Sequence, residues 1–343
     1  KIVGYSLNID EDAFLLQGST TAQDFQTQCQ LMCAGLLDPG YREEALWQFR
    51  KAVPELIQSL KHTPQGPMIE LRSWLHGGDS RFSTADADKL NSYTLEDVRK
   101  WLGPELAKGH LELSIVGDFD TKTILPSLLA TFGALPERAS RPPVLSSARW
   151  IDFPKAPAQK KLTYASKVPQ GIATTIWKTL PLRDNQRDFR RLNILADILG
   201  DRQREEIREK LGASYSPNVG AGGSEALEGV GYIMSQSIGK PEDLPLLQKT
   251  AIDLAAKMAQ EGATQDEFTR AINPLLGMLE KSQRDNNYWL TTVLSRCQQD
   301  PERIELARNR EKDYRSITLE QINTLARKYL AEKNALSISI QSE

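Results

Sequence analysis

The sequence predicts an α+β fold of two homologous domains, each a mostly antiparallel sheet packed with helices. The prediction rests on an internal repeat, on strands with alternating polar and apolar residues, and on the lack of a regular β-α-β alternation. The chain has 343 residues, enough for two domains of roughly 100–200 residues each. Hydrophobic residues make up 40% and charged residues 26%, as is usual for a globular protein with a buried core.

The repeat relates an early and a late part of the chain. Residues 48–60, QFRKAVPELIQSL, match residues 267–279, EFTRAINPLLGML, with a Phe, a basic residue and an Ala at equal positions. Residues 92–117 match residues 316–341 in the same way, because each contains Thr-Leu-Glu, then an amphipathic helix, then an alternating strand. Such self-similarity predicts two copies of one structural unit.

Each copy carries its own helix and strand signals. Thr94 and Thr318 each precede a Leu-Glu pair and a helical apolar pattern, so we predict that both are N-caps. Residues 111–117, LELSIVG, and 335–341, ALSISIQ, alternate with a period of two. This alternation predicts a final strand in each copy, in an antiparallel sheet with one buried face.

The two copies differ in length. Residue 1 aligns near residue 220, so residues 159–219 of the second copy have no counterpart in the first. Those residues contain two predicted strands, a long helix and the start of a third strand. A sheet without its first strands would leave open edges. We therefore expect the first domain to lack its N-terminal strands, because the chain is a fragment or because another polypeptide supplies them.

A stretch rich in Pro, Ser and Arg separates the copies, as is typical of a linker that crosses a surface. We predict a truncated domain at 1–137, a linker at 138–158 and a complete domain at 159–343.

Composition and spacing argue against several functional classes. Lys and Arg number 43 and Asp and Glu 45, which argues against nucleic-acid binding through bulk charge. No stretch reaches the ~18 apolar residues of a membrane span. The candidate metal ligands are His62, His76, His110, Cys29, Cys33 and Cys297. None of them lies at the spacing of a known zinc motif, so we expect no metal site in this chain.

The glycine-rich segment 218–231, NVGAGGSEALEGVG, does not match a nucleotide-binding loop, and a strand pattern follows it rather than a helix. A β-hairpin, with glycines at positive φ, is the better interpretation.

Three features resemble the pitrilysin/insulinase family of zinc metallopeptidases, the inverzincins, over nearly the whole chain. They are residues 90–120 followed by TFGALPER, the segment DRQREEIREKLGASYS at 201–216, and the two-domain layout with a Pro-rich linker. The resemblance implies a metallohydrolase-like fold of the processing-peptidase type. Gln203 departs from the family pattern, which usually has an apolar residue there, and this departure could alter the local helix packing.

In that family, an N-terminal half carries HxxEH and a distal Glu that hold zinc, and a C-terminal half lacks the metal. This chain contains no HxxEH, so the resemblance implies the C-terminal half, inactive alone, with zinc in the N-terminal catalytic half. The family's last domain donates an Arg and a Tyr to the active site. Arg208 and Tyr215 match that pair, and would bind the peptide substrate and stabilise its transition state.

Alternatives remain. Arg208 can be an ordinary basic residue at a helix C-terminus, and Tyr215 a half-buried strand aromatic. Some relatives have lost catalysis and act as scaffolding or assembly subunits, and an unrelated stand-alone enzyme is a third hypothesis. Because bacterial relatives are often exported, we expect the periplasm rather than the cytoplasm.

Overall fold

The computed structural model describes residues 1–143, 146–211 and 217–343. It confirms the α+β class, and the chain divides into two compact units, each discontinuous in sequence. Unit 1 comprises Lys1–Pro54, Ala87–Leu145 and Ser282–Ala307. Unit 2 comprises Glu55–Asp86, Ser146–Lys281 and Arg308–Glu343. The domain limits given above, at 137 and 159, stay a prediction.

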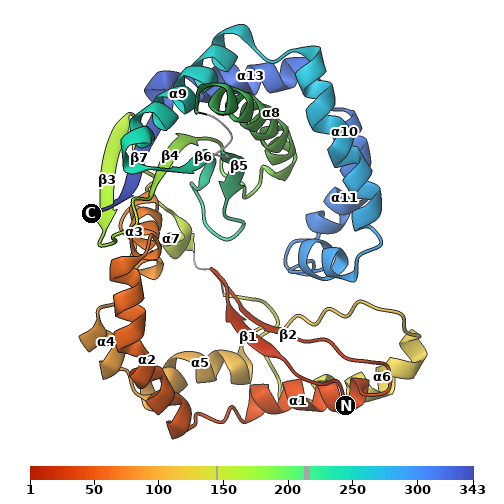
Figure 1. Cartoon of the computed structure of the whole chain (residues 1–343). Helices are drawn as coiled ribbons and strands as arrows, with labels where there is room; N and C mark the ends of the chain where they lie inside the picture. The colour runs from red at the N-terminus through yellow and green to blue at the C-terminus, as the bar shows by residue number, and fades with distance from the viewer. Residues whose placement is uncertain (144–145, 212–216) are drawn as a thin grey trace. The chain divides into compact units, whose positions relative to one another are not determined.

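Unit 2 is built on a five-stranded sheet with the order β3-β7-β4-β6-β5 (Figure 1). Its strands are β3 Ala158–Tyr164, β4 Gly171–Lys178, β5 Asn218–Gly223, β6 Gly231–Gly239 and β7 Ala335–Ser342. β3 pairs with β7 in parallel, and the other pairs are antiparallel, as a mostly antiparallel sheet requires. β5 and β6 form the hairpin predicted from the glycine-rich segment, with Gly229 at φ +83° in the loop.

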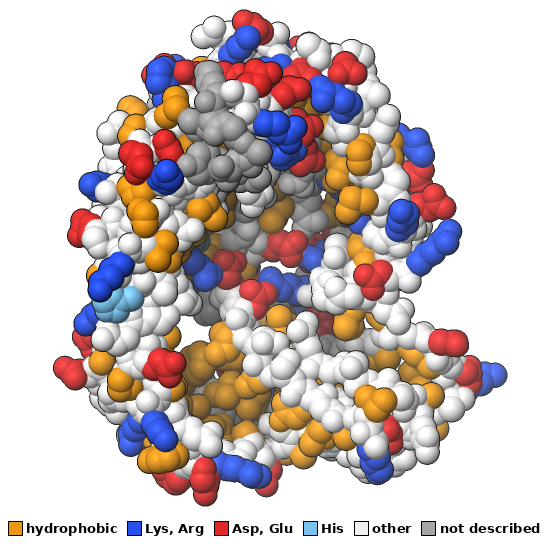
Figure 2. All heavy atoms as spheres, in the orientation of Figure 1, with side chains coloured by type: hydrophobic (Ala, Val, Ile, Leu, Met, Phe, Trp, Pro, Cys, Tyr) orange, Lys and Arg blue, Asp and Glu red, His pale blue; other side chains and the backbone are white. Residues whose placement is uncertain are grey.

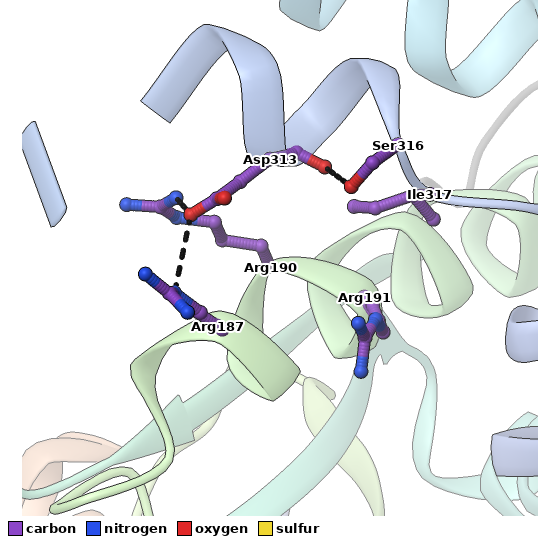
Figure 3. A pocket seen from close by; sticks show the side chains of 6 residues that line it. All are labelled: Arg187, Arg190, Arg191, Asp313, Ser316 and Ile317. Atoms are coloured by element: carbon purple, nitrogen blue, oxygen red, sulfur yellow. Dashed lines mark hydrogen bonds and ion pairs between the residues drawn. The ribbon is translucent and has the colours of Figure 1, made fainter. Parts of the chain in front are cut away.

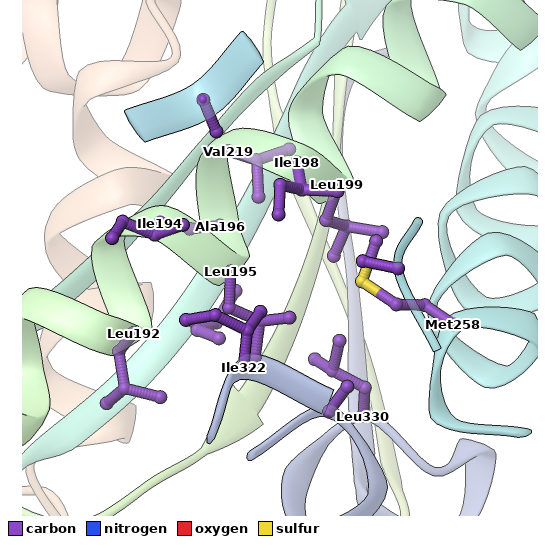
Figure 4. Packing of buried hydrophobic residues seen from close by; sticks show 14 of the residues in the cluster. Leu192, Ile194, Leu195, Ala196, Ile198, Leu199, Val219, Met258, Ile322 and Leu330 are labelled. Carbon is purple, nitrogen blue, oxygen red and sulfur yellow. The ribbon is translucent and has the colours of Figure 1, made fainter. Parts of the chain in front are cut away.

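Helices cover one face of this sheet and α3 packs near β3 on the other. The helices of unit 2 are α3 Gln65–Leu75, α7 Ser146–Arg149, α8 Gln186–Leu211, α9 Leu244–Glu261, α12 Arg310–Arg315 and α13 Leu319–Tyr329. α8 packs against β5, α9 and α13. The largest hydrophobic cluster of the described residues lies between the helices and the sheet, and Figure 4 shows part of it. Trp177 of β4 belongs to this cluster. The neighbouring Ile176 points to the opposite face, where it packs in the cluster of Leu71 and Leu75 from α3.

Unit 1 has a smaller sheet of two antiparallel strands, β1 and β2. Its elements are β1 Ser6–Ile9, β2 Phe14–Gln17, α1 Phe25–Leu37, α4 Ala87–Ser92, α5 Leu95–Lys108 and α6 Thr121–Ala130. Three further helices reach a boundary between the units: α2 Glu43–His62, α10 Gln265–Ser282 and α11 Glu302–Arg308. Short 3₁₀ or π turns are Ser80–Phe82, Phe132–Ala134, Pro241–Asp243, Tyr288–Val293 and Glu332–Asn334.

The helix starts confirm the repeat. Thr94 and Thr318 are both N-caps, and each forms a capping box with the residue three positions later. In the first box, the Asp97 N–H donates to Thr94 Oγ1 at 3.1 Å and the Thr94 N–H donates to Asp97 Oδ2 at 2.9 Å. Gln321 plays the part of Asp97 in the second box. Such reciprocal bonds satisfy two backbone donors that a helix start otherwise leaves unpaired.

The strand predicted at 111–117 is wrong, because the structure has an irregular segment there. Its counterpart β7 lies between β3 and β4 and is hydrogen-bonded to both. The described part of unit 1 has no strand in those two positions. Alternating residues are not sufficient for a strand, because its backbone groups need a neighbouring strand as partner.

Apolar side chains on α5 of unit 1 are more exposed than their counterparts on α13 of unit 2. Ile322 of α13 is fully buried in the core beside α8, whereas its repeat counterpart Val98 is 36% exposed. Trp101 is 56% exposed and contacts Phe14 edge-to-face, with ring centroids 5.2 Å apart. Hydrophobic side chains are accordingly visible on the surface of unit 1 in Figure 2. No described helix of unit 1 takes the place that α8 has in unit 2.

We predict that Thr318→Ala lowers the free energy of unfolding by about 1 kcal/mol, because it removes the acceptor that caps α13. Thr318→Ser keeps the hydroxyl and serves as the control. Urea unfolding followed by circular dichroism measures both variants. Equal stability of the two would show that the cap contributes nothing.

Candidate functional site

α8 carries the predicted site residue Arg208 and is held in place by its apolar side. Six of its large aliphatic residues are at most 1% exposed: Leu192, Ile194, Leu195, Ile198, Leu199 and Ile207. Figure 4 shows several of them packed towards Ile322 and Leu330. Ile207 is buried at 1% exposure, and the next residue, Arg208, is exposed. Arg208 therefore lies on the exposed side of α8, and the opposite side of the helix is buried in the core.

An ion pair fixes α8 to the helices behind it. Arg202 Nε and Nη2 donate to the two carboxylate oxygens of Glu267 at 2.6 and 2.9 Å. Arg202 also donates to the Gly262 carbonyl, and Glu267 accepts from the Thr264 backbone N–H at 2.7 Å. The hydrogen bonds from Arg202 lower the pKa of Glu267 to about 2. A planar pair with both oxygens bonded holds the helix at a defined rotation.

Gln203 lies one residue further, inside the core. It is fully buried, and its Oε1 accepts a hydrogen bond from Ser235 Oγ of β6 at 2.6 Å. Its Nε2 is buried without a hydrogen-bond partner. Gln203 thus joins α8 to β6 through a side-chain hydrogen bond, and the effect of its departure from the family pattern stays a prediction. One unpaired amide group in the core costs stability.

Tyr215 lies outside the described residues. The structure therefore does not test whether Tyr215 approaches Arg208, and the pairing stays a prediction. Arg208 lies in the last turn of α8, which ends at Leu211, so a basic residue is also favourable there because of the helix dipole.

A cavity of about 200 Å³ lies near the start of α8 (Figure 3). Its lining residues are Arg187, Arg190, Arg191, Asp313, Ser316 and Ile317. Asp313 accepts from Arg190 Nη1 at 2.5 Å and forms an ion pair with Arg187 at 3.4 Å. Burial lowers the pKa of Arg190, and the adjacent Asp313 carboxylate acts in the opposite direction. Arg187 and Arg190 of α8 share the single carboxylate of Asp313 on α12, and these contacts join the two helices.

A second hollow lies beside α3, where Lys160 forms an ion pair with Glu70 at 3.0 Å and lies 5.8 Å from the Trp74 ring centroid. Neither hollow is predictable from the sequence. Their residues are distant in the chain and occur in no short motif, so nothing in local spacing indicates them.

The three histidines are each engaged by a nearby backbone carbonyl. Nδ1 of His62, His76 and His110 lies 2.9, 2.7 and 3.1 Å from the carbonyl oxygens of Ala165, Arg72 and Ala139, respectively. Cys29 and Cys33 are buried on α1, which raises the pKa of both thiols.

Among the described residues, no group of three or more His, Cys, Asp or Glu could hold a metal ion. These residues therefore do not fit the zinc ligand set of the family's catalytic half. Nor is any described helix both long and apolar enough to cross a membrane.

The family model of the peptidase M16 inactive domain matches residues 92–275, more than half of the chain. The chain belongs to this family. The resemblance to the pitrilysin/insulinase peptidases is thereby confirmed, and with it the assignment to their inactive half. A search among curated proteins found no match.

Solved structures share the fold. The periplasmic protease PqqL from Escherichia coli has a TM-score of 0.80 and 15% identity, over 99% of this chain and 37% of PqqL. The peptidase M16 inactive domain from Pseudomonas fluorescens has a TM-score of 0.79 and 17% identity, over 99% of this chain and 81% of that one. A chain of Complex III2 from Candida albicans has a TM-score of 0.72 and 10% identity, over 98% and 81%. The chain thus spans little more than a third of PqqL.

We predict a pH dependence from the Arg202–Glu267 pair. The pKa of Glu267 is about 2 when folded and 4.5 ordinarily, so its contribution to stability is complete above pH 4.5 and is lost as the pH falls towards 2. Glu267→Gln should be less stable than the wild type at pH 6, and the difference should shrink by pH 3. Urea unfolding at both pH values measures it; a difference independent of pH would contradict the assignment.

A second prediction concerns the buried polar pair. Gln203→Met and Ser235→Ala should each destabilise the fold by about 1–3 kcal/mol, because each leaves a buried polar group unpaired. The double variant should recover most of the loss, since neither group then remains. A double-mutant cycle of urea unfolding measures this coupling, and simple additivity would disprove it.

Proposed function

We propose that this chain is the non-catalytic half of a zinc metallopeptidase, which binds the peptide substrate and donates Arg208 and Tyr215 to the zinc site of the catalytic half. The match of the inactive-domain family over residues 92–275 carries this proposal. The exposed position of Arg208 on a helix with a fully buried opposite side supports it.

The proposed donors suit the chemistry of peptide hydrolysis. Attack on a peptide carbonyl builds negative charge on its oxygen, and the transition state is stabilised by donors that already point at that oxygen. The Arg208 guanidinium offers several N–H donors, and the Tyr215 hydroxyl offers one more. One such donor typically contributes ~3–4 kcal/mol. Rigid attachment matters because a donor fixed in advance loses little entropy on binding.

The two halves would supply different catalytic groups. The described residues offer no metal-ligand group, so the metal and the general base would come from the catalytic half, in the same polypeptide or as a separate subunit. Catalysis would then require the two halves to come together, and their closure would shield the bound substrate from bulk solvent. PqqL is a periplasmic protease, and we propose the periplasm for this protein too.

The test is reconstitution with a catalytic half that carries HxxEH, assayed on a fluorogenic peptide. Arg208→Ala and Tyr215→Phe should each lower kcat by about 10²–10³-fold. Arg204→Ala is the matched control, because Arg204 lies one turn earlier on α8 and pairs with Asp201. Its kcat should match the wild type.

Light scattering of each complex separates loss of catalysis from loss of pairing. Full turnover by the Arg208 and Tyr215 variants, with pairing intact, would refute their role as donors.

The second candidate is a catalytically inert scaffolding or assembly subunit. A chain of Complex III2 has the same fold at 10% identity, and the fold alone therefore does not imply a peptidase. This candidate predicts tight pairing with a partner, no turnover in the reconstituted complex and no affinity for peptides.

A further inference from the structure

The cavity at the start of α8 is lined by more positive than negative charge (Figure 3). Arg187, Arg190 and Arg191 line it from the first turns of α8, and Asp313 lines it from α12. Arg191 pairs with Asp188, and the other two arginines share Asp313. Three guanidinium groups therefore meet two carboxylates around a space of about 200 Å³.

These arginines occupy electrostatically unfavourable positions, because basic residues near a helix N-terminus are repelled by its dipole. Arg187 and Arg191 are four positions apart, and like charges at this spacing destabilise a helix. Burial lowers the pKa of Arg190, and Asp313 opposes this shift. Arg310 and Arg187 add to it, because like charges nearby disfavour the protonated form. An anion bound in the cavity would offset each of these repulsions.

The arginines also offer hydrogen-bond donors to a ligand. Arg191 Nε is buried and has no hydrogen-bond partner among the described residues. An unsatisfied donor beside a positively charged cavity indicates a place where an acceptor binds. The Arg187 side chain is 63% exposed and contacts Asp313 through Nε at 3.4 Å, so its two Nη groups can still donate to a ligand.

We propose that this cavity binds a phosphate group, as the free ion or as part of a phosphate monoester. A phosphate monoester carries about −1.5 to −2 charges at pH 7, which suits a cavity with excess positive charge. Its oxygens point in several directions, so they can accept from guanidinium groups on different sides of the cavity. Because Arg187 is exposed, a substituent on the phosphate can extend into solvent past this side chain.

The proposed site is complete within one unit of the chain. All six lining residues belong to unit 2, so binding does not require unit 1 or a catalytic half. The 343-residue chain alone is therefore sufficient for the test.

The test is isothermal titration calorimetry with inorganic phosphate and with glycerol 3-phosphate, at pH 7.5 and constant ionic strength. Arg187→Gln and Arg191→Gln should each weaken phosphate binding about tenfold, because each removes charge-assisted hydrogen bonds. Arg204→Gln is the matched control, since Arg204 also lies on α8 and pairs with Asp201, three positions earlier. The Kd of this control should stay within about twofold of wild type.

Thermal unfolding in phosphate and in chloride supplies a measurement that a purely structural role of Arg187 would not affect. Phosphate should raise the Tm of the wild type by about 2 °C relative to chloride, and that of Arg187→Gln much less. In chloride the two proteins should unfold within about 1 °C of each other, because an exposed ion pair contributes little. The exposed position of Arg187 means that this variant decides the outcome if Arg191→Gln fails to fold.

The two ligands distinguish the source of the phosphate. Tighter binding of glycerol 3-phosphate would identify a monoester as the ligand, and tighter binding of inorganic phosphate would identify the free ion. Equally tight binding of acetate, or wild-type affinity in both cavity variants, would show a general effect of anions and overturn the proposal. Absence of binding by both phosphate ligands at ~10 mM would overturn it as well.

Discussion

The burial of α8 is the constraint on which the rest of unit 2 depends. One side of this helix fills the space between the sheet, α9 and α13, and six of its large aliphatic side chains are almost wholly inaccessible to water. The repeat offers an internal comparison. Unit 1 has α5 as the counterpart of α13 but, among its described residues, no helix in the place of α8. There Val98 and Trp101 are exposed, and residues 111–117 do not form a strand.

Polar groups on α8 add specific contacts that help to set its orientation. The Arg202–Glu267 pair and the Gln203–Ser235 hydrogen bond both lie in the C-terminal half of the helix, shortly before Arg208. The Arg202–Glu267 pair is partly buried, and its paired hydrogen bonds tolerate little displacement. A helix held at a fixed rotation presents Arg208 in a fixed direction, which is what a donor to a transition state requires.

A peptidase-family fold without HxxEH is compatible with a role in catalysis if the metal site lies in a separate catalytic half. A half without metal ligands can still supply charge stabilisation and a surface for the substrate.

Sequence alone determined the features that depend on neighbouring residues. The repeat, the N-caps Thr94 and Thr318 and the hairpin of 218–231 were all predictable, because caps and turns require particular side chains within a few positions. The pattern of Arg208 and Tyr215 was visible as well, but only the tertiary structure could show that Arg208 is exposed, and it does not describe Tyr215. The failure of 111–117 to form a strand, the parallel pairing of β3 with β7 and the arginine cluster around Asp313 depend on segments far apart in the chain. Only tertiary structure could decide these, because a strand or an ion pair exists only where its partner lies.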